Sequence, residues 1–131
     1  MGATYEIVFD GGSKGNPGKG YGSYEITRDG RVVAHTAEDF GDNLTNNQAE
    51  YMTLIRALSW LADELGDDAI RTSVVVNGDS QLVIRQLKGE WKIKDAKMRG
   101  LAMDARTQMA RFGQVSLTWH PRAMSVARLG H

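Results

Sequence analysis

The chain has 131 residues, enough for one domain with a substantial hydrophobic core. Its 41% hydrophobic and 24% charged residues are typical of a globular protein and exclude a disordered one. The absence of cysteine excludes disulfides and thiolate metal sites, and neither a signal peptide nor an apolar run of roughly 18 residues is present. We therefore expect a single cytoplasmic domain over residues 1–131, a monomer that makes no membrane contact.

The charge is unevenly distributed although the formal net charge is zero. Residues 1–84 carry 6 basic and 13 acidic residues, whereas residues 85–131 carry 10 and 3. This asymmetry fits an acidic metal site beside a basic binding surface. It has no functional meaning if folding interleaves the two halves.

Three strands are predicted at the start of the chain. Residues 4–10 form an apolar run that two glycines end, and a loop is expected at 11–19. The next strands are predicted at 21–27 and 32–40, joined by an Asp-Gly turn, which gives an antiparallel meander. Asp10 then lies at the last position of a core strand, although an Asp before two glycines is often only a turn residue.

A long amphipathic helix is predicted next. Thr45 and Gln48 have the spacing of a capping box, and Gly66 ends the helix. The apolar stripe is Tyr51, Leu54, Ile55, Leu58, Leu61, Ala62 and Leu65. Glu50 lies on or beside this stripe, where a buried carboxylate needs a partner or a cation. The alternative is an ordinary acid that the helix dipole favours in the first turn.

The second half of the chain alternates strands and helices. A β-branched strand is predicted at 72–77, and a helix begins soon after it. Asp79 lies between the two, either as a site residue or as a plain helix N-cap. A basic aromatic link leads to a helix at about 95–112 and a last strand at 115–119. For the last nine residues the sequence favours no particular structure.

Three acids therefore occupy related positions. Asp10 and Asp79 each end a core strand, and Glu50 lies on the helix between them. If the two strands are neighbours, the carboxylates converge at the edge of the sheet where α/β proteins bind ligands. Three carboxylates without cysteine suit Mg²⁺ or Mn²⁺ rather than Zn²⁺. Such a cluster suits metal-assisted phosphoryl transfer.

The motifs around these acids resemble type 1 ribonuclease H, over residues 4–122. They are FDGGSKGNPG at 9–18, TNNQAEY at 45–51, GDSQLV at 78–83, GEWK at 89–92 and WHPR at 119–122. The resemblance implies an α/β ribonuclease H-like fold, a five-stranded mixed sheet of order 3-2-1-4-5 flanked by helices. The short link at 88–94 resembles the compact branch of the family, which lacks a basic protrusion.

The resemblance also implies a reaction. A two-ion Mg²⁺ site, with Mn²⁺ as a substitute, would hydrolyse the RNA strand of RNA/DNA hybrids to 5′-phosphate and 3′-hydroxyl ends. Asp10 would bridge both ions, and Glu50 and Asp79 would complete the ion on the leaving-group side.

Substrate contacts follow from the same resemblance. Amide side chains would read the minor groove, since they can bond 2′-hydroxyls and base edges. Thr45 would contact a phosphate of the DNA strand, and Arg122 would contact a phosphate. Trp91, with the nearby Lys92 and Lys94, would line the channel for the DNA strand. The residues are Asn16, Thr45, Asn46, Asn47, Gln81, Trp91 and Arg122. For Trp91, core packing is the alternative.

The chain departs from the family pattern after the last strand. The family has a fourth carboxylate there, but in this chain Ser125 replaces the preceding Asn. Aligned without a gap, the position of the acid holds Leu129; with a short deletion, Ala127 and Arg128 flank the missing acid. The last acid in the chain is Asp104. Asp10 would then be the only protein carboxylate on the water-activating ion, with Ser125 or His131 as partial substitutes. We expect hybrid binding to be retained and cleavage to be weakened.

Two other functions compete with an active ribonuclease. The first is a hybrid-binding module of the same fold with little or no catalysis, which the missing acid favours. The second is an integrase-type polynucleotidyl transferase, against which the two Asn-containing motifs and Gln81 argue, because they suit 2′-hydroxyl recognition.

Overall fold

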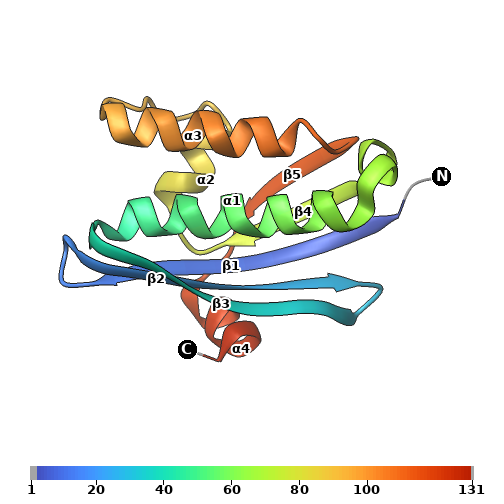
Figure 1. The fold of residues 1–131 in the computed structure, drawn as a ribbon, viewed down its shortest axis with the longest axis horizontal. Coiled ribbons are helices and arrows are strands. Elements are labelled where there is room, and N and C mark those ends of the chain that lie inside the picture. The colour runs from blue at the N-terminus through green and yellow to red at the C-terminus, as the bar shows by residue number, and fades with distance from the viewer. Residues whose placement is uncertain (1–2, 131) are drawn as a thin grey trace.

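A mixed five-stranded sheet forms the centre of the computed structural model, which describes residues 3–130 (Figure 1). The strands lie in the order β3-β2-β1-β4-β5, which confirms the order expected from the sequence. β2 is antiparallel to β1 and β3, whereas β1, β4 and β5 are parallel to one another. The strands are β1 Thr4–Lys14, β2 Gly18–Arg28, β3 Arg31–Leu44, β4 Ser73–Gly78 and β5 Gln114–Trp119.

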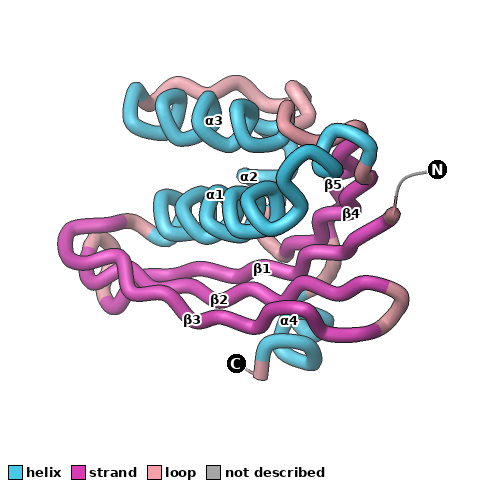
Figure 2. Tube along the Cα trace, turned by 45° about the vertical axis from the view of Figure 1, so that its right-hand side comes forward, coloured by secondary structure: helices cyan, strands magenta, loops and turns pink. Residues whose placement is uncertain are grey.

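Helices cover both faces of this sheet. Three of them, α1, α2 and α3, lie on one face, and α4 lies on the other (Figure 2). They are α1 Asn46–Leu65, a 3₁₀ helix η1 Gly66–Arg71, α2 Gln81–Leu87, α3 Ala96–Met109 and α4 Arg122–Leu129. Within residues 3–130, no helix is both long and apolar enough to cross a membrane.

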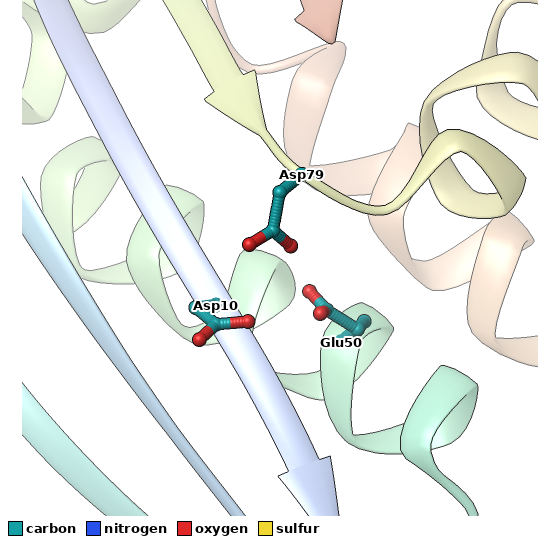
Figure 3. A group of neighbouring side chains, drawn as sticks. All are labelled: Asp10, Glu50 and Asp79. Atoms are coloured by element: carbon teal, nitrogen blue, oxygen red, sulfur yellow. The ribbon is translucent and has the colours of Figure 1, made fainter. Parts of the chain in front are cut away.

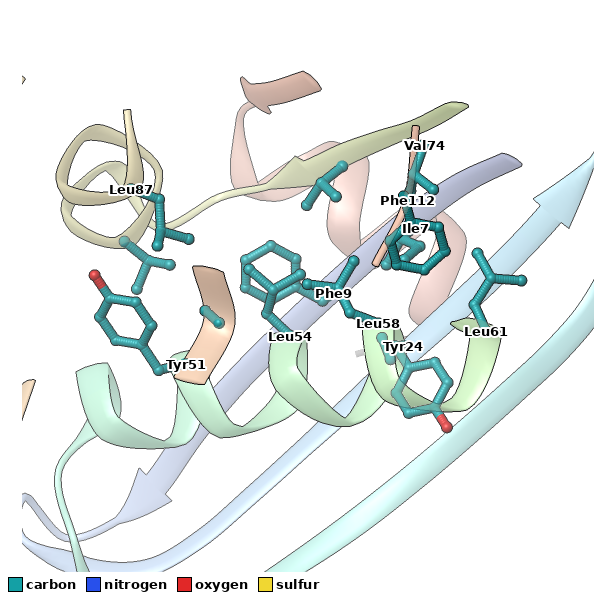
Figure 4. Packing of buried hydrophobic residues seen from close by; sticks show 14 of the residues in the cluster. Ile7, Phe9, Tyr24, Tyr51, Leu54, Leu58, Leu61, Val74, Leu87 and Phe112 are labelled. Atoms are coloured by element: carbon teal, nitrogen blue, oxygen red, sulfur yellow. The ribbon is translucent and has the colours of Figure 1, made fainter. Parts of the chain in front are cut away.

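The hydrophobic core lies between α1 and the sheet (Figure 4). Alternate residues of β1, including Ile7 and Phe9, are fully buried there. The buried positions of α1 recur at helical spacing and include Tyr51, Leu54, Leu58 and Leu61. Burial of each such side chain contributes roughly 1.5–3 kcal/mol to the free energy of unfolding. The core therefore fixes α1, which carries Glu50, over β1, which carries Asp10.

The first two strands are longer than predicted. The expected loop at 11–19 is mostly strand, and only residues 15–17 form the turn. Gly11 pairs with Gly22 across the hairpin, and a Cβ on Gly22 would clash with Thr53 of α1. The glycines therefore permit a close approach between helix and hairpin, and they do not end the strand.

The end of the described chain is a helix, where the sequence favoured no structure. α4 begins after Pro121 at the N-cap, and its buried positions are Ser125 and Leu129. It ends at Gly130, whose φ of 82° lies in the left-handed region that glycine adopts readily. His131 lies outside the described residues.

Candidate active site

Asp10 and Asp79 lie side by side because β1 pairs in parallel with β4. In that register Phe9 is opposite Gly78, so the two acids are the next residues along both chains. Asp79 does not cap α2, since Ser80 is the N-cap and its hydroxyl accepts the capping hydrogen bond at 3.3 Å. The interpretation of Asp79 as a helix cap is therefore wrong.

Glu50 reaches the same place from α1. The predicted capping box is present: Thr45 Oγ1 accepts from Gln48 N at 3.2 Å, and Gln48 Oε1 accepts from Thr45 N at 3.0 Å. This box fixes where the helix begins. A hydrogen bond from the Gly11 backbone to the Glu50 carboxylate joins the helix to β1.

The three carboxylates converge, as the sequence predicted (Figure 3). One carboxylate oxygen from each of Asp10, Glu50 and Asp79 lies within 4.8 Å of the others. Asp10 is 2% exposed and Glu50 is 6% exposed. Glu50 is thus a buried side chain rather than an exposed acid of a first helical turn.

The electrostatics of the cluster disfavour three negative charges. Burial raises the pKa of Glu50 well above its usual range, and the neighbouring charges of Asp10 and Asp79 raise it further. Burial and Asp10 also raise the pKa of Asp79, against the opposing effects of Arg122, Ser125 and His120. A bound cation would remove this repulsion.

The donor set fits a hard divalent cation. Among the described residues, Glu50 Oε2 and Asp79 Oδ2 are buried and accept no hydrogen bond. Buried carboxylate oxygens in this condition need a proton or a cation. Since Mg²⁺ binds through a few carboxylates and keeps several waters, these residues suit it.

Arg122 extends over the cluster from the first turn of α4. Its Nη1 lies 3.8 Å from Asp10 Oδ1 and 3.7 Å from Asp79 Oδ2. The Arg122 side chain is 66% exposed, so the same guanidinium faces both the carboxylates and the solvent. This position suits contact with a phosphate that approaches the carboxylates.

Ser125, His120 and Trp119 support Asp79 from the side of α4. Ser125 is fully buried, and its Oγ lies 2.8 Å from His120 Nε2. A hydrogen bond from Ser125 and the charge of His120 both lower the pKa of Asp79, although burial dominates and raises it. Trp119 Nε1 donates to the backbone oxygen of Asp79 at 3.1 Å. Within residues 3–130, no acid of α4 joins the cluster.

Two of the three asparagines predicted to contact substrate, Asn16 and Asn46, are brought together at one edge of the site. Asn46 N donates to Asn16 Oδ1 at 3.1 Å, and Ser13 N donates to Asn46 Oδ1 at 2.8 Å. These bonds tie the β1–β2 turn to the start of α1. Both asparagines are exposed.

The remaining predicted contacts lie around these asparagines and beyond α2. Asn47 and Gln81 are exposed in the first turns of α1 and α2, and Thr45 is half-buried with its hydroxyl in the capping box. Trp91 is 43% exposed, with the Arg85 guanidinium 5.4 Å from its ring centroid. Core packing of Trp91 is therefore wrong, and the ring is accessible to a ligand.

Sequence reasoning missed part of this site. The contact between Trp119 and Asp79 depends on the pairing of β5 with β4, and the contact of Ser125 with His120 depends on helix α4 following the last strand. The only local signal was that WHPR follows a predicted strand, since residues at such strand ends face the site.

Together, the fold and the acidic cluster define a ribonuclease H-like protein, and comparisons with known proteins agree. The family described as reverse transcriptase-like matches residues 9–127. Ribonuclease HI of Halobacterium salinarum is 41% identical over 123 residues, which cover 93% of this chain and 59% of that protein. The bifunctional protein Rv2228c of Mycobacterium tuberculosis is 37% identical over 89% of this chain and 31% of its own length. The chain thus spans less than two thirds of these relatives.

Solved structures give the same result at fuller coverage. RNase H1 of Halobacterium salinarum superposes with a TM-score of 0.84 at 38% identity, covering 93% of this chain and 89% of that one. LC11-RNase H1 in complex with an RNA/DNA hybrid superposes with a TM-score of 0.86 at 30% identity, covering 94% and 89%. The chain belongs to the type 1 ribonuclease H family.

Proposed function

We propose that this protein is an endoribonuclease that uses Mg²⁺, or Mn²⁺ in its place, to hydrolyse the RNA strand of RNA/DNA hybrids. The observation that carries the proposal is the carboxylate cluster of the buried Asp10 and Glu50 and the half-buried Asp79, in which one oxygen from each residue lies within 4.8 Å of the others. Relatives support it, since one is a ribonuclease HI and another is in complex with an RNA/DNA hybrid.

Asp10, Glu50 and Asp79 would hold the ions. When bound, two divalent ions would polarise the scissile phosphate and supply a nucleophilic water near neutral pH. Hydrolysis would leave 5′-phosphate and 3′-hydroxyl ends. Because Asp10 and Glu50 are buried, water screens their charges less than it would at the surface. Arg122 lies 3.7 Å from Asp79, where it would contact the approaching phosphate.

The hybrid would lie across the edge formed by the β1–β2 turn and the first turns of α1 and α2. The amide groups there suit contact with 2′-hydroxyls and minor-groove base edges. The residues are Asn16, Asn46, Asn47 and Gln81. Thr45 would contact the DNA backbone, and the exposed ring of Trp91 would stack along the DNA strand.

A hybrid-binding module with little catalysis is the second candidate. The observation that favours it is the neutral hydroxyl of Ser125 beside Asp79, where α4 contributes no carboxylate. Both candidates require the same substrate contacts and differ only in turnover.

Cleavage of a labelled RNA/DNA hybrid in Mg²⁺ and in Mn²⁺ tests the proposal, with a DNA duplex of the same sequence as the control substrate. We expect the wild type to cut only the hybrid and to leave 5′-phosphates that a phosphatase removes. Asp10→Asn is expected to lower cleavage by ~100-fold or more while hybrid binding persists. Cleavage that Asp10→Asn leaves intact would sink the metal-site assignment. Tight binding by a wild type that does not cleave would favour the binding module.

A further inference from the structure

A half-buried ion-pair cluster lies under the C-terminal end of α4, on the sheet face opposite α1. Arg128 Nη1 lies 2.8 Å from Glu6 Oε1 on β1. Its Nη2 and Nε lie 2.7 Å and 2.8 Å from Glu25 Oε1 on β2. One guanidinium therefore bonds two carboxylates from neighbouring strands.

The two carboxylates are themselves held by the sheet. Asn77 Nδ2 of β4 donates to Glu6 Oε2 at 3.0 Å, and His35 Nδ1 of β3 lies 3.5 Å from Glu25 Oε2. Glu25 is only 7% exposed. Because a buried carboxylate is costly without a cation, Arg128 has a strong preference for this one place on the sheet.

The anchored end of α4 is rigidly connected to the end at the acidic cluster. Arg122, Ser125 and Arg128 are spaced three residues apart, so they follow one side of the helix. Arg122 and Arg128 are six positions apart, which corresponds to about 9 Å along the helix axis. The structure thus links the ion-pair cluster to the candidate active site through one short helix.

The same strand receives both ends of this helix. Glu6 and Asp10 are four residues apart on β1 and share a face of the sheet, about 13 Å apart. Arg128 pairs with Glu6, and Arg122 faces Asp10. Rotation or sliding of α4 on the sheet would therefore break the contact at Glu6 and also displace Arg122 from Asp10.

We propose that Arg128 is a positioning residue, whose ion pairs with Glu6 and Glu25 fix α4 on the sheet and thereby hold Ser125 and Arg122 at the carboxylate cluster. The docking of α4 stands independently of the reaction, whereas the effect on turnover rests on the proposed function.

Trp119 offers a direct readout of this docking. Its indole N–H donates to the backbone oxygen of Asp79. The carboxylate of the same residue is the group on which Ser125 and His120 act. The indole N–H signal of Trp119 in an ¹H–¹⁵N spectrum therefore reports the environment of Asp79 without any substrate or metal. A role of Arg128 in overall stability alone would not move that signal in the folded protein.

The test compares Arg128→Met, Arg128→Lys and the control Arg111→Met. Arg111 bonds Asp63 of α1 at 2.7 Å through an exposed ion pair away from α4. In fully folded protein, Arg128→Met is expected to speed amide hydrogen exchange in residues 122–129 and to shift the Trp119 signal. It is expected to lower kcat for hybrid cleavage ~10-fold with KM changed less than about 2-fold. Arg128→Lys is expected to fall between Met and wild type, and Arg111→Met to match the wild type.

Wild-type exchange in α4 and an unmoved Trp119 signal in Arg128→Met would overturn the proposal. If Arg128→Met does not fold, Arg128→Lys decides by the same two measurements, because it keeps the charge but loses the paired bonds to Glu25. If the wild type does not cleave hybrids, the proposed function fails, and the exchange and Trp119 measurements still decide whether Arg128 positions α4.

Discussion

Gly11 of β1 lies directly against Ala49 of α1. A Cβ on Gly11 would lie 2.7 Å from both the carbonyl carbon and the carbonyl oxygen of Ala49, a distance that real Cβ atoms do not adopt. Glu50 is the next residue on the helix, and its carboxylate accepts a hydrogen bond from the Gly11 backbone. The helix that carries Glu50 can therefore approach the strand that carries Asp10 only because position 11 has no side chain.

Gly11→Ala is expected to separate α1 from β1. The backbone has to move, because the clash is with a main chain and no flexible side chain can relieve it. We expect the free energy of unfolding to fall by about 1–3 kcal/mol, measured by urea denaturation. Hybrid cleavage is expected to fall by ~100-fold through displacement of Glu50.

Gly100→Ala is the matched control for this change. Gly100 lies inside α3 with open space around its Cβ position and no positive φ. There the substitution is expected to stabilise the protein by roughly 0.5–1 kcal/mol, because alanine favours the helix. Cleavage is expected to be unchanged. Wild-type stability and activity in Gly11→Ala would contradict the close-approach argument.

The raised pKa of Glu50 is expected to make the metal-free protein less stable as the pH rises. The carboxyl ionises near its ordinary pKa of 4.5 in the unfolded chain, and at higher pH in the folded protein because of burial and the charges of Asp10 and Asp79. Between the two pKa values the folded state binds more protons than the unfolded state, so the free energy of unfolding falls with increasing pH. Asp79 acts in the same direction.

Thermal melting at a series of pH values, with and without Mg²⁺, checks this expectation. Glu50→Gln removes one titrating group and is expected to melt at a higher temperature than the wild type in the metal-free protein at neutral pH. Added Mg²⁺ is expected to raise the melting temperature of the wild type most at high pH, where the carboxylates are ionised. Glu64→Gln, an exposed position on α1, is the control. Identical pH profiles for the wild type and Glu50→Gln would contradict a raised pKa of Glu50 caused by burial and charge repulsion in the carboxylate cluster.

The strand order was predicted through the resemblance of the motifs to a known family, and the acidic cluster through the positions of its acids in the predicted elements. Asp79 directly follows a predicted strand, and Glu50 lies near the start of a helix that has a capping box and an apolar stripe. Asp10, in contrast, lies inside β1 and not at the end of the strand, where the sequence had predicted it. The extent of the β1–β2 hairpin was not predictable in this way. From the sequence alone, Gly11 is typical of the end of a strand. Its role in the close approach of α1 is visible only in the folded protein, where it contacts Ala49.

Helix α4 was missed for a related reason. It has eight residues, too few to be stable through helix propensity alone. Its position depends on Arg128, which pairs with Glu25 and Glu6 at separations of 103 and 122 residues in the sequence. No local sequence pattern includes Arg128 together with Glu6 and Glu25. For the same reason, the contact of Ser125 with Asp79 could not be predicted from the sequence.

Trp91→Ala is expected to weaken hybrid binding without affecting the chemistry. The ring is 43% exposed and is supported by the Arg85 guanidinium, so it is a stacking surface rather than part of the core. Loss of stacking is expected to cost about 1–3 kcal/mol of binding free energy, measured by fluorescence anisotropy with a labelled hybrid. The value of kcat and the melting temperature are expected to stay near those of the wild type.

Ile70→Ala is the control for Trp91→Ala, because it truncates a 60% exposed apolar side chain on η1. It is expected to leave both hybrid affinity and kcat unchanged. A Trp91→Ala variant with wild-type affinity would remove this tryptophan from the substrate surface.

Ser125→Asp is expected to strengthen metal-dependent cleavage. Position 125 is fully buried beside Asp79, so an acid there would add a fourth carboxylate to the cluster, with His120 Nε2 as a neighbour. Without metal, the added charge is expected to lower the melting temperature; with Mg²⁺, cleavage is expected to rise about tenfold over the wild type. Ser125→Asn, similar in size and uncharged, is expected to show neither effect. Equal cleavage and equal Mg²⁺-dependent stabilisation in the two variants would mean that position 125 does not reach the ions.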